Sequence, residues 1–182
     1  MVNLKFSSMK KISCFRPIGF FTLLLFLVSC DRNNKLSEKG EMLEKIILTE
    51  EGHFRGITIG DKIDKVKNVE KAALADEDKD YLYYDINLNE NDFYNIAYSF
   101  DESGLYEIMV DVNFDNKAEV EELFNSFDKY FTDKYGEGFM EENFTIWKTS
   151  SDVSKQIEIA MTNNIEDSGE GYLSIAISNY SY

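Results

Sequence analysis

The chain has 182 residues, with 19 Lys and Arg against 34 Asp and Glu, which gives a formal net charge of -15 at pH 7. This length accommodates one domain, or two small repeats around one core, and it excludes a large multidomain enzyme. The acidic balance excludes nucleic acid as a partner, because affinity for phosphate backbones comes from Lys and Arg that displace counterions.

The first 29 residues have the composition of a secretory signal peptide. Their only charged side chains are Lys5, Lys10, Lys11 and Arg16, and the range 18–29 that follows is apolar. This run is shorter than the roughly 20 apolar residues that a helix needs to cross a bilayer. We therefore expect residues 1–29 to be removed from the mature protein.

The apolar run ends at Leu27-Val28-Ser29-Cys30, which resembles the lipobox of bacterial lipoproteins. The resemblance implies that Cys30 carries a diacylglyceryl group and an amide-linked chain, the kind of modification that palmitate labels, and two or more chains anchor a protein stably. An ordinary secretory signal or an N-terminal membrane helix is the alternative. We expect a lipoprotein of the bacterial cell envelope, and both a periplasmic location and outward-facing display stay open. Asp31 resembles an inner-membrane retention signal of some bacteria, but other lineages sort differently, so inner and outer membrane both stay open.

The mature chain divides into a tether and one domain. Residues 30–52 read as a lipidated tether with a short helix, in which Leu43, Ile46 and Ile47 share a face. Residues 53–182 read as a single α+β domain that contains an internal repeat, at about 56–114 and about 116–180.

The first repeat begins at Gly56 and leads into a helix that we expect Asp61 to cap. The helix has apolar residues at helical spacing, namely Ile63, Val66, Val69 and Ala73. Alternating apolar residues then predict strands at 81–88, 93–100 and 105–114, joined by polar turns.

The second repeat has the strongest helical pattern of the chain. Asn116 is the expected cap, Gly136 the expected C-terminal glycine, and the apolar residues between them follow a helical period. Strands are predicted at 144–149, 155–163 and 171–180. The sequence therefore predicts two helix-plus-three-strand repeats that form a six-stranded antiparallel sheet, with the helices packed on one face.

Short motifs of the domain resemble those of two envelope families. The segment Gly56-Ile57-Thr58-Ile59-Gly60-Asp61, and the segment 131–136 followed by Trp147, are similar to small lipoproteins of the BamE (SmpA/OmlA) type and to beta-lactamase-inhibitor-like tandem α/β repeats. The sequence has Glu137 and Gly138 where many relatives carry proline. The resemblance implies a sheet surface or loops that bind other proteins, and it implies no active site.

The catalytic and metal-binding inventory is short. His53 is the only histidine, and no nucleophile motif, phosphate-binding glycine loop or Cys-x-x-Cys is present. The acidic run 76–80 resembles the start of a calcium loop. Tyr81 and Asn87, however, occupy the positions at which such a loop needs glycine and glutamate. This favours a solvated acidic turn; the alternative is a weak calcium site that also uses Asp85. We expect no catalytic residues, no metal site and no cofactor.

Aromatic residues and a methionine are left on the strand face opposite the core. The candidate partner-binding residues are Tyr81, Tyr83, Phe93 and Met109, with Trp147 joining them if Phe144 and Ile146 point into the core. Such side chains are enriched in interface cores, although they can also pack over strand edges or under residues 37–54. The sequence thus predicts a lipid-anchored, non-catalytic protein-binding domain. The alternatives are a glycan- or peptide-binding surface on Tyr81, Tyr83 and Trp147, and a structural component of an envelope assembly.

Overall fold

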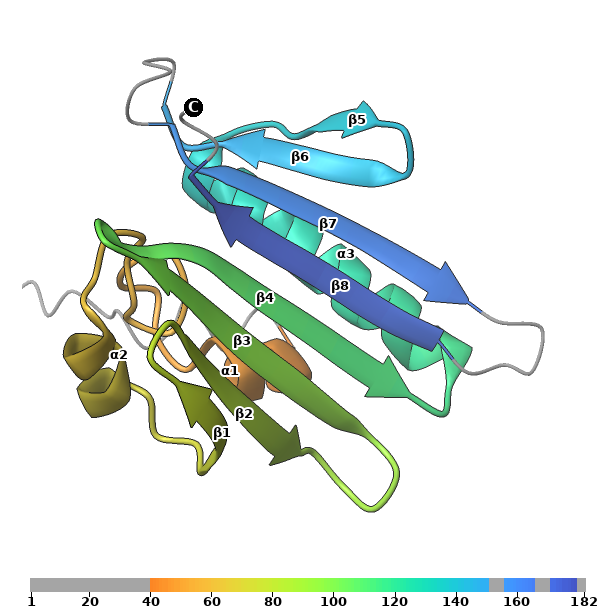
Figure 1. The fold of residues 1–182 in the computed structure, drawn as a ribbon. Coiled ribbons are helices and arrows are strands. Elements are labelled where there is room, and N and C mark those ends of the chain that lie inside the picture. The colour runs from red at the N-terminus through yellow and green to blue at the C-terminus, as the bar shows by residue number, and fades with distance from the viewer. Residues whose placement is uncertain (1–39, 151–155, 166–170, 180–182) are drawn as a thin grey trace, which may run out of the picture. The chain divides into compact units, whose positions relative to one another are not determined.

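Eight antiparallel strands form one sheet in the computed structural model, which describes residues 40–150, 156–165 and 171–179. The strands are β1 (Leu74–Asp78), β2 (Tyr81–Asn87), β3 (Phe93–Asp101), β4 (Gly104–Phe114), β5 (Phe139–Glu141), β6 (Phe144–Lys148), β7 (Glu158–Ile165) and β8 (Gly171–Ser178). Their order in the sheet is β1-β2-β3-β4-β8-β7-β6-β5, so two consecutive meanders meet where β4 pairs with β8 (Figure 1).

The expected six-stranded sheet built from two helix-plus-three-strand repeats is wrong. The described residues contain eight strands and three helices, because β1 and β5 each add a strand at one edge of the sheet. All residues of these two strands are exposed, so neither shows the alternation of buried and exposed positions that marks a strand in a sequence. Short, charged strands such as β1 are common at sheet edges, where they discourage pairing with other chains.

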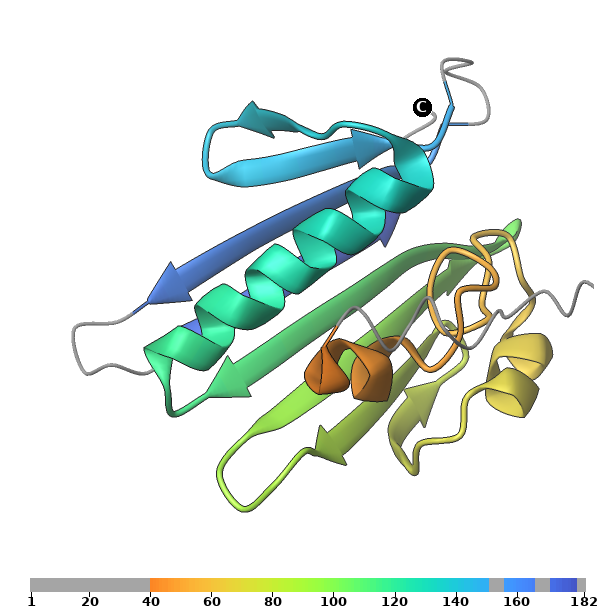
Figure 2. The ribbon, with the colours of Figure 1, turned by 180° about the vertical axis from the view of Figure 1, so that it is seen from behind.

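Helix α3 (Lys117–Tyr135) covers the half of the sheet formed by β4, β8, β7 and β6 (Figure 2). The Asn116 side chain accepts a hydrogen bond from the Ala118 amide at 2.9 Å, which confirms the predicted cap. Gly136, the predicted C-terminal glycine, has φ 91°, a value that favours glycine. Phe131 packs α3 onto the sheet, because its ring lies 5.2 Å from that of Trp147 in β6, and within the helix it stacks on Phe127 at 5.7 Å.

Helices α1 (Glu41–Ile47) and α2 (Ile63–Val69) belong to the other half of the domain. Helix α1 lies on the same side of the sheet as α3 and contacts it, and α2 lies toward β1 (Figure 2). Leu43, Ile46 and Ile47 of α1 are buried in the core, as their spacing predicts. The expected cap of α2 is wrong, since Asp61 accepts instead from the Thr58 amide at 2.9 Å and closes the preceding turn.

A buried ion pair joins these elements to the sheet. The Arg55 guanidinium donates to both carboxylate oxygens of Glu70, at 2.8 and 2.6 Å, and to the Ile46 carbonyl at the end of α1. Two tyrosines of β3 complete the cluster. Arg55 also donates to the Tyr94 hydroxyl at 3.0 Å, and the Tyr98 hydroxyl donates to the Glu70 carboxylate at 2.9 Å. Because this cluster is buried and its charges are paired, it acts as a structural link among α1, the end of α2 and β3.

The remaining core lies between the helices and one face of the sheet. Buried side chains alternate along the central strands, as in β3, where Tyr94, Ile96, Tyr98 and Phe100 face the helices. The opposite face carries no helix in the part of the chain that the structure describes (Figure 1). We call it the uncovered face.

Candidate functional site

A continuous line of apolar side chains crosses the uncovered face from β2 to β5. Antiparallel partners that are directly opposite each other share a face, so the pairing register fixes the members of this line. They are, in strand order, Tyr83, Ala97, Met109, Ala176, Ala160, Ile146 and Phe139, and we call them the apolar row. With strands 4.7–4.9 Å apart, the row extends over roughly 29 Å.

Polar rows lie on both sides of the apolar row. One contains Tyr81, Ser99, Glu107, Ser178, Glu158 and Lys148, and the other contains Asp85, Asn95, Asp111, Ser174 and Thr162. The Ser174 hydroxyl donates to the Asp111 carboxylate at 2.6 Å and fixes its position between β4 and β8. The face therefore has an apolar centre with polar flanks, in which four acidic side chains outnumber the one basic side chain.

A shallow hollow of about 730 Å³ lies on this face over β4, β8, β7 and β6. Its lining includes four members of the apolar row, Met109, Ala176, Ala160 and Ile146. Other lining residues are Glu107, Glu141, Glu142, Phe144, Glu158, Thr162, Tyr172 and Ser174. The alanines make the hollow, because they end at Cβ where longer side chains would fill the space above the strands.

The structure brings some of the predicted site residues together. Tyr83 and Met109 both belong to the apolar row, with Ala97 between them, and Met109 is 36% exposed. Tyr81 lies two positions before Tyr83 on the same face. Its hydroxyl donates to Asp76, and that hydrogen bond, with smaller effects of burial and nearby carboxylates, raises the pKa of Tyr81 to about 12.

Phe93 is on the uncovered face but at its far end. It pairs with Asn113, which pairs in turn with Tyr172, and these residues border a separate hollow of about 290 Å³. Phe93 is therefore not a member of the apolar row.

The expectation that Trp147 joins the uncovered face is wrong. Its side chain is 1% exposed and packs against Phe131 on the helix side, and its Nε1 donates to the Thr132 hydroxyl at 3.2 Å. Ile146, and not Trp147, lies on the uncovered face as a member of the apolar row, because it pairs with Ala160. A glycan platform on Tyr81, Tyr83 and Trp147 therefore lacks its largest ring on this face.

Gly138 explains why Trp147 fits under α3. A Cβ at Gly138 would lie 2.8 Å from both Cε2 and Nε1 of the indole, closer than side-chain carbons approach. The absence of a side chain at this position thus leaves room for the ring.

Sequence reasoning missed most of the apolar row. Ala97, Ala160, Ala176 and Ile146 carry no individual signal, and Phe139 belongs to the unpredicted strand β5. The sequence shows that these residues alternate with apolar core residues along each strand. It does not show that they line up across the sheet, because that depends on the pairing of β4 with β8. That pairing joins two segments that are far apart in the chain.

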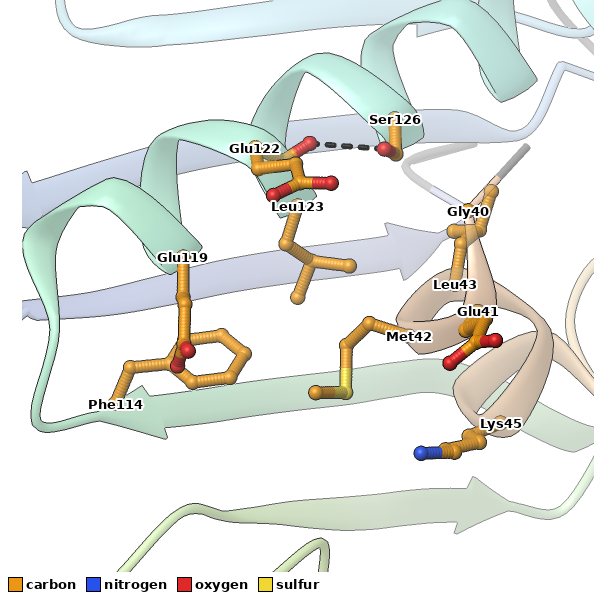
Figure 3. A pocket seen from close by; sticks show the side chains of 10 residues that line it. All are labelled: Gly40, Glu41, Met42, Leu43, Lys45, Phe114, Glu119, Glu122, Leu123 and Ser126. Atoms are coloured by element: carbon orange, nitrogen blue, oxygen red, sulfur yellow. Dashed lines mark hydrogen bonds between the residues drawn. The ribbon is translucent and has the colours of Figure 1, made fainter.

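A third hollow lies on the helix side, between α1, α3 and β4 (Figure 3). It measures about 360 Å³, and Met42 and Leu123 lie over its interior while Glu119 and Glu122 lie along α3. Leu123 and the neighbouring Leu43 belong to the core. We assign this space to the packing gap between two adjoining helices.

The remaining candidate groups have structural surroundings. His53 accepts the Ile59 amide hydrogen through Nδ1 at 3.0 Å, and burial, with the positive charge of Lys134, lowers its pKa. The acidic run that resembles a calcium loop forms β1 and its turn into β2. Within the described ranges, no group of three or more His, Cys, Asp or Glu side chains is arranged to hold a metal ion.

The membrane-related predictions fall on residues 1–39, which lie outside the described residues. The signal at 1–29, Cys30 and the first part of the tether, up to residue 39, belong to this part of the chain. None of the helices in the described ranges has the length and apolarity needed to cross a membrane.

Comparison with known proteins gives no relative, since no family model, curated protein or solved structure matches the chain. The similarity to the BamE-type and beta-lactamase-inhibitor-like families therefore rests on the short motifs alone. What the protein does has to be inferred from its own surface.

Proposed function

We propose that this chain is a lipid-anchored envelope domain that binds a protein partner through its uncovered face and performs no chemistry of its own. The observation that carries the proposal is the apolar row, which crosses seven strands without a covering helix in the described residues. A contiguous apolar surface with a polar rim is typical of protein interaction sites. Met109 supports this assignment, because an exposed methionine adapts its shape to different partners.

The proposed anchor is Cys30, on the basis of the lipobox that precedes it. An acidic domain is repelled by anionic lipid headgroups, so a tethered domain of this charge stays available to a partner in the surrounding space. Cys30→Ser tests the anchor, since the variant should lose both labelling by radioactive palmitate and processing by the lipoprotein peptidase. Labelling that persists in this variant contradicts the proposal.

Photo-crosslinking in intact cells tests the binding face. We would incorporate p-benzoylphenylalanine at Ala176, in the middle of the apolar row, and at Asn125, an exposed position of α3 that serves as the control. We expect a discrete protein adduct from position 176 that position 125 does not give. Identical products from both positions, or no adduct from position 176, would contradict the assignment of this face.

A further inference from the structure

The uncovered face is far more acidic than basic. By register and strand alternation it carries eight acidic side chains, namely Asp76, Asp78, Asp85, Asp101, Glu107, Asp111, Glu141 and Glu158. Lys148 is the single basic residue in the described strands. It lies 3.6 Å from Glu158 and its ammonium is 5.3 Å from the centre of the Phe139 ring, so its charge is already used locally.

We propose that the partner contacts this face with a Lys- and Arg-rich polypeptide segment whose apolar side chains enter the hollow over the alanines of the apolar row. This inference rests on the proposed function and names the chemistry of the partner. The occupant is a different polypeptide, not a lipid surface or a second copy of this chain.

Charge complementarity carries the first step. Carboxylates border the apolar row on both flanks, with Glu107 and Glu158 on one side and Asp111 on the other. Single exposed pairs contribute little to affinity, but a face of one sign attracts a cationic segment over a distance and sets its orientation. Binding of this kind weakens as salt increases.

Hydrogen-bonding capacity supports the same chemistry. Carboxylates are acceptors only, and the two polar rows hold four of them, Asp85, Glu107, Asp111 and Glu158. The face therefore has an excess of acceptors. Lys and Arg side chains supply donors without acceptors, which is the complement that such a face lacks.

The shape of the hollow sets the second requirement. Ala160 and Ala176 form its floor beside Met109 and Ile146, in a space of about 730 Å³. A segment made only of charged residues would leave this apolar floor uncovered, so affinity requires apolar side chains between the basic ones.

The lysines in and beside α2 do not provide this complement. In and beside α2, Lys62 donates to the carbonyls of Glu102 and Ser103 at 3.2 and 2.9 Å, and Lys65 pairs with Asp61 at 2.7 Å. Lys67 pairs with Glu77. A second copy would have to break these bonds to offer its α2 lysines, which disfavours pairing between copies.

Fluorescence anisotropy with the full chain tests the inference. The probe is a labelled synthetic peptide of alternating Lys and Leu, and its matched control alternates Glu and Leu. The face variant combines Glu107→Gln, Asp111→Asn and Glu158→Gln, and the control variant makes the same change of net charge on exposed helix positions with Glu119→Gln, Glu122→Gln and Asp133→Asn. Circular dichroism verifies that both variants fold.

We expect the Lys and Leu peptide to bind the wild type, with the face variant weakened about tenfold because three surface charge contacts are lost, and the control variant weakened less than about twofold. Equal losses in the two variants would overturn the inference, since they would show only general attraction to an acidic protein. Binding of the Glu and Leu peptide as strong as that of the Lys and Leu peptide would also overturn it. So would self-association of the chain that the face variant abolishes, because the occupant would then be a second copy.

The in-cell adduct at position 176 separates this inference from the proposed function. An adduct that disappears in the face variant but persists in the control variant supports both. An adduct that persists unchanged in the face variant overturns the cationic partner while the binding face stands. If the wild type gives no adduct at position 176, the proposed function itself is wrong.

Discussion

Trp147→Ala should strongly destabilise the domain, because the indole belongs to the core and not to a binding surface. Its side chain is 1% exposed and packs on Phe131. A buried aromatic side chain removes about 200 Å² from water, which at about 25 cal/mol per Å² corresponds to about 5 kcal/mol as an upper bound. Truncation of a buried Trp to Ala typically costs about 3–5 kcal/mol, and the lost hydrogen bond to Thr132 falls within that range.

Urea unfolding followed by circular dichroism measures this loss. With a slope of about 2 kcal/mol per M, the midpoint should fall by roughly 2 M. Tyr83→Ala is the control, since Tyr83 is a large aromatic residue on the uncovered face, and we expect it to cost less than about 1 kcal/mol. A Trp147→Ala variant as stable as Tyr83→Ala would refute the placement of the indole under α3. Trp147 is the only tryptophan, so weak quenching of the wild-type fluorescence by acrylamide checks the same burial.

Two further predictions concern the core. Burial opposes ionisation of Glu70, but hydrogen bonds from Arg55, the Ala72 amide and Tyr98 outweigh it and hold the pKa of Glu70 below its ordinary 4.5. Glu70→Gln should therefore lower the unfolding free energy by about 3–5 kcal/mol at neutral pH, because it leaves Arg55 buried without a countercharge. The difference in unfolding free energy between variant and wild type should shrink as the pH falls through the lowered pKa of Glu70, since the wild type then loses the same charge. A difference that urea unfolding finds independent of pH would contradict this. Gly138→Ala should cost about 1–3 kcal/mol because its Cβ would lie 2.8 Å from the indole, and a thermal midpoint equal to that of the wild type would show that the ring shifts freely.

Local signals predicted the elements whose structure is local. The spacing in α3, its Asn116 cap and the glycine at 136 lie within one segment of sequence, and the structure has all three. The strands with clear alternation, such as β3 and β4, were located for the same reason, since a sheet that is buried on one face imposes a period of two. The edge strands β1 and β5 are exposed throughout, so burial left no pattern to read.

Long-range pairing decided what the sequence left open. In β6, Ile146 and Trp147 are adjacent and both apolar, so alternation alone does not tell which one faces the helices. The pairing of Ile146 with Ala160 settles it. The same holds for Arg55 and Glu70, whose ion pair depends on packing among α1, α2 and β3 and not on spacing in the chain.

Hydroxyl-radical footprinting, on the purified chain and in intact cells, tests the central claim most directly. Met109 and Phe139 report on the uncovered face, and Met161, which is fully buried, is the internal control. We predict that Met109 and Phe139 are oxidised in the purified protein and protected in cells, while Met161 is protected in both. Protection of Met109 in the purified chain, or equal oxidation in both settings, would contradict a face that is open to a partner and occupied by one.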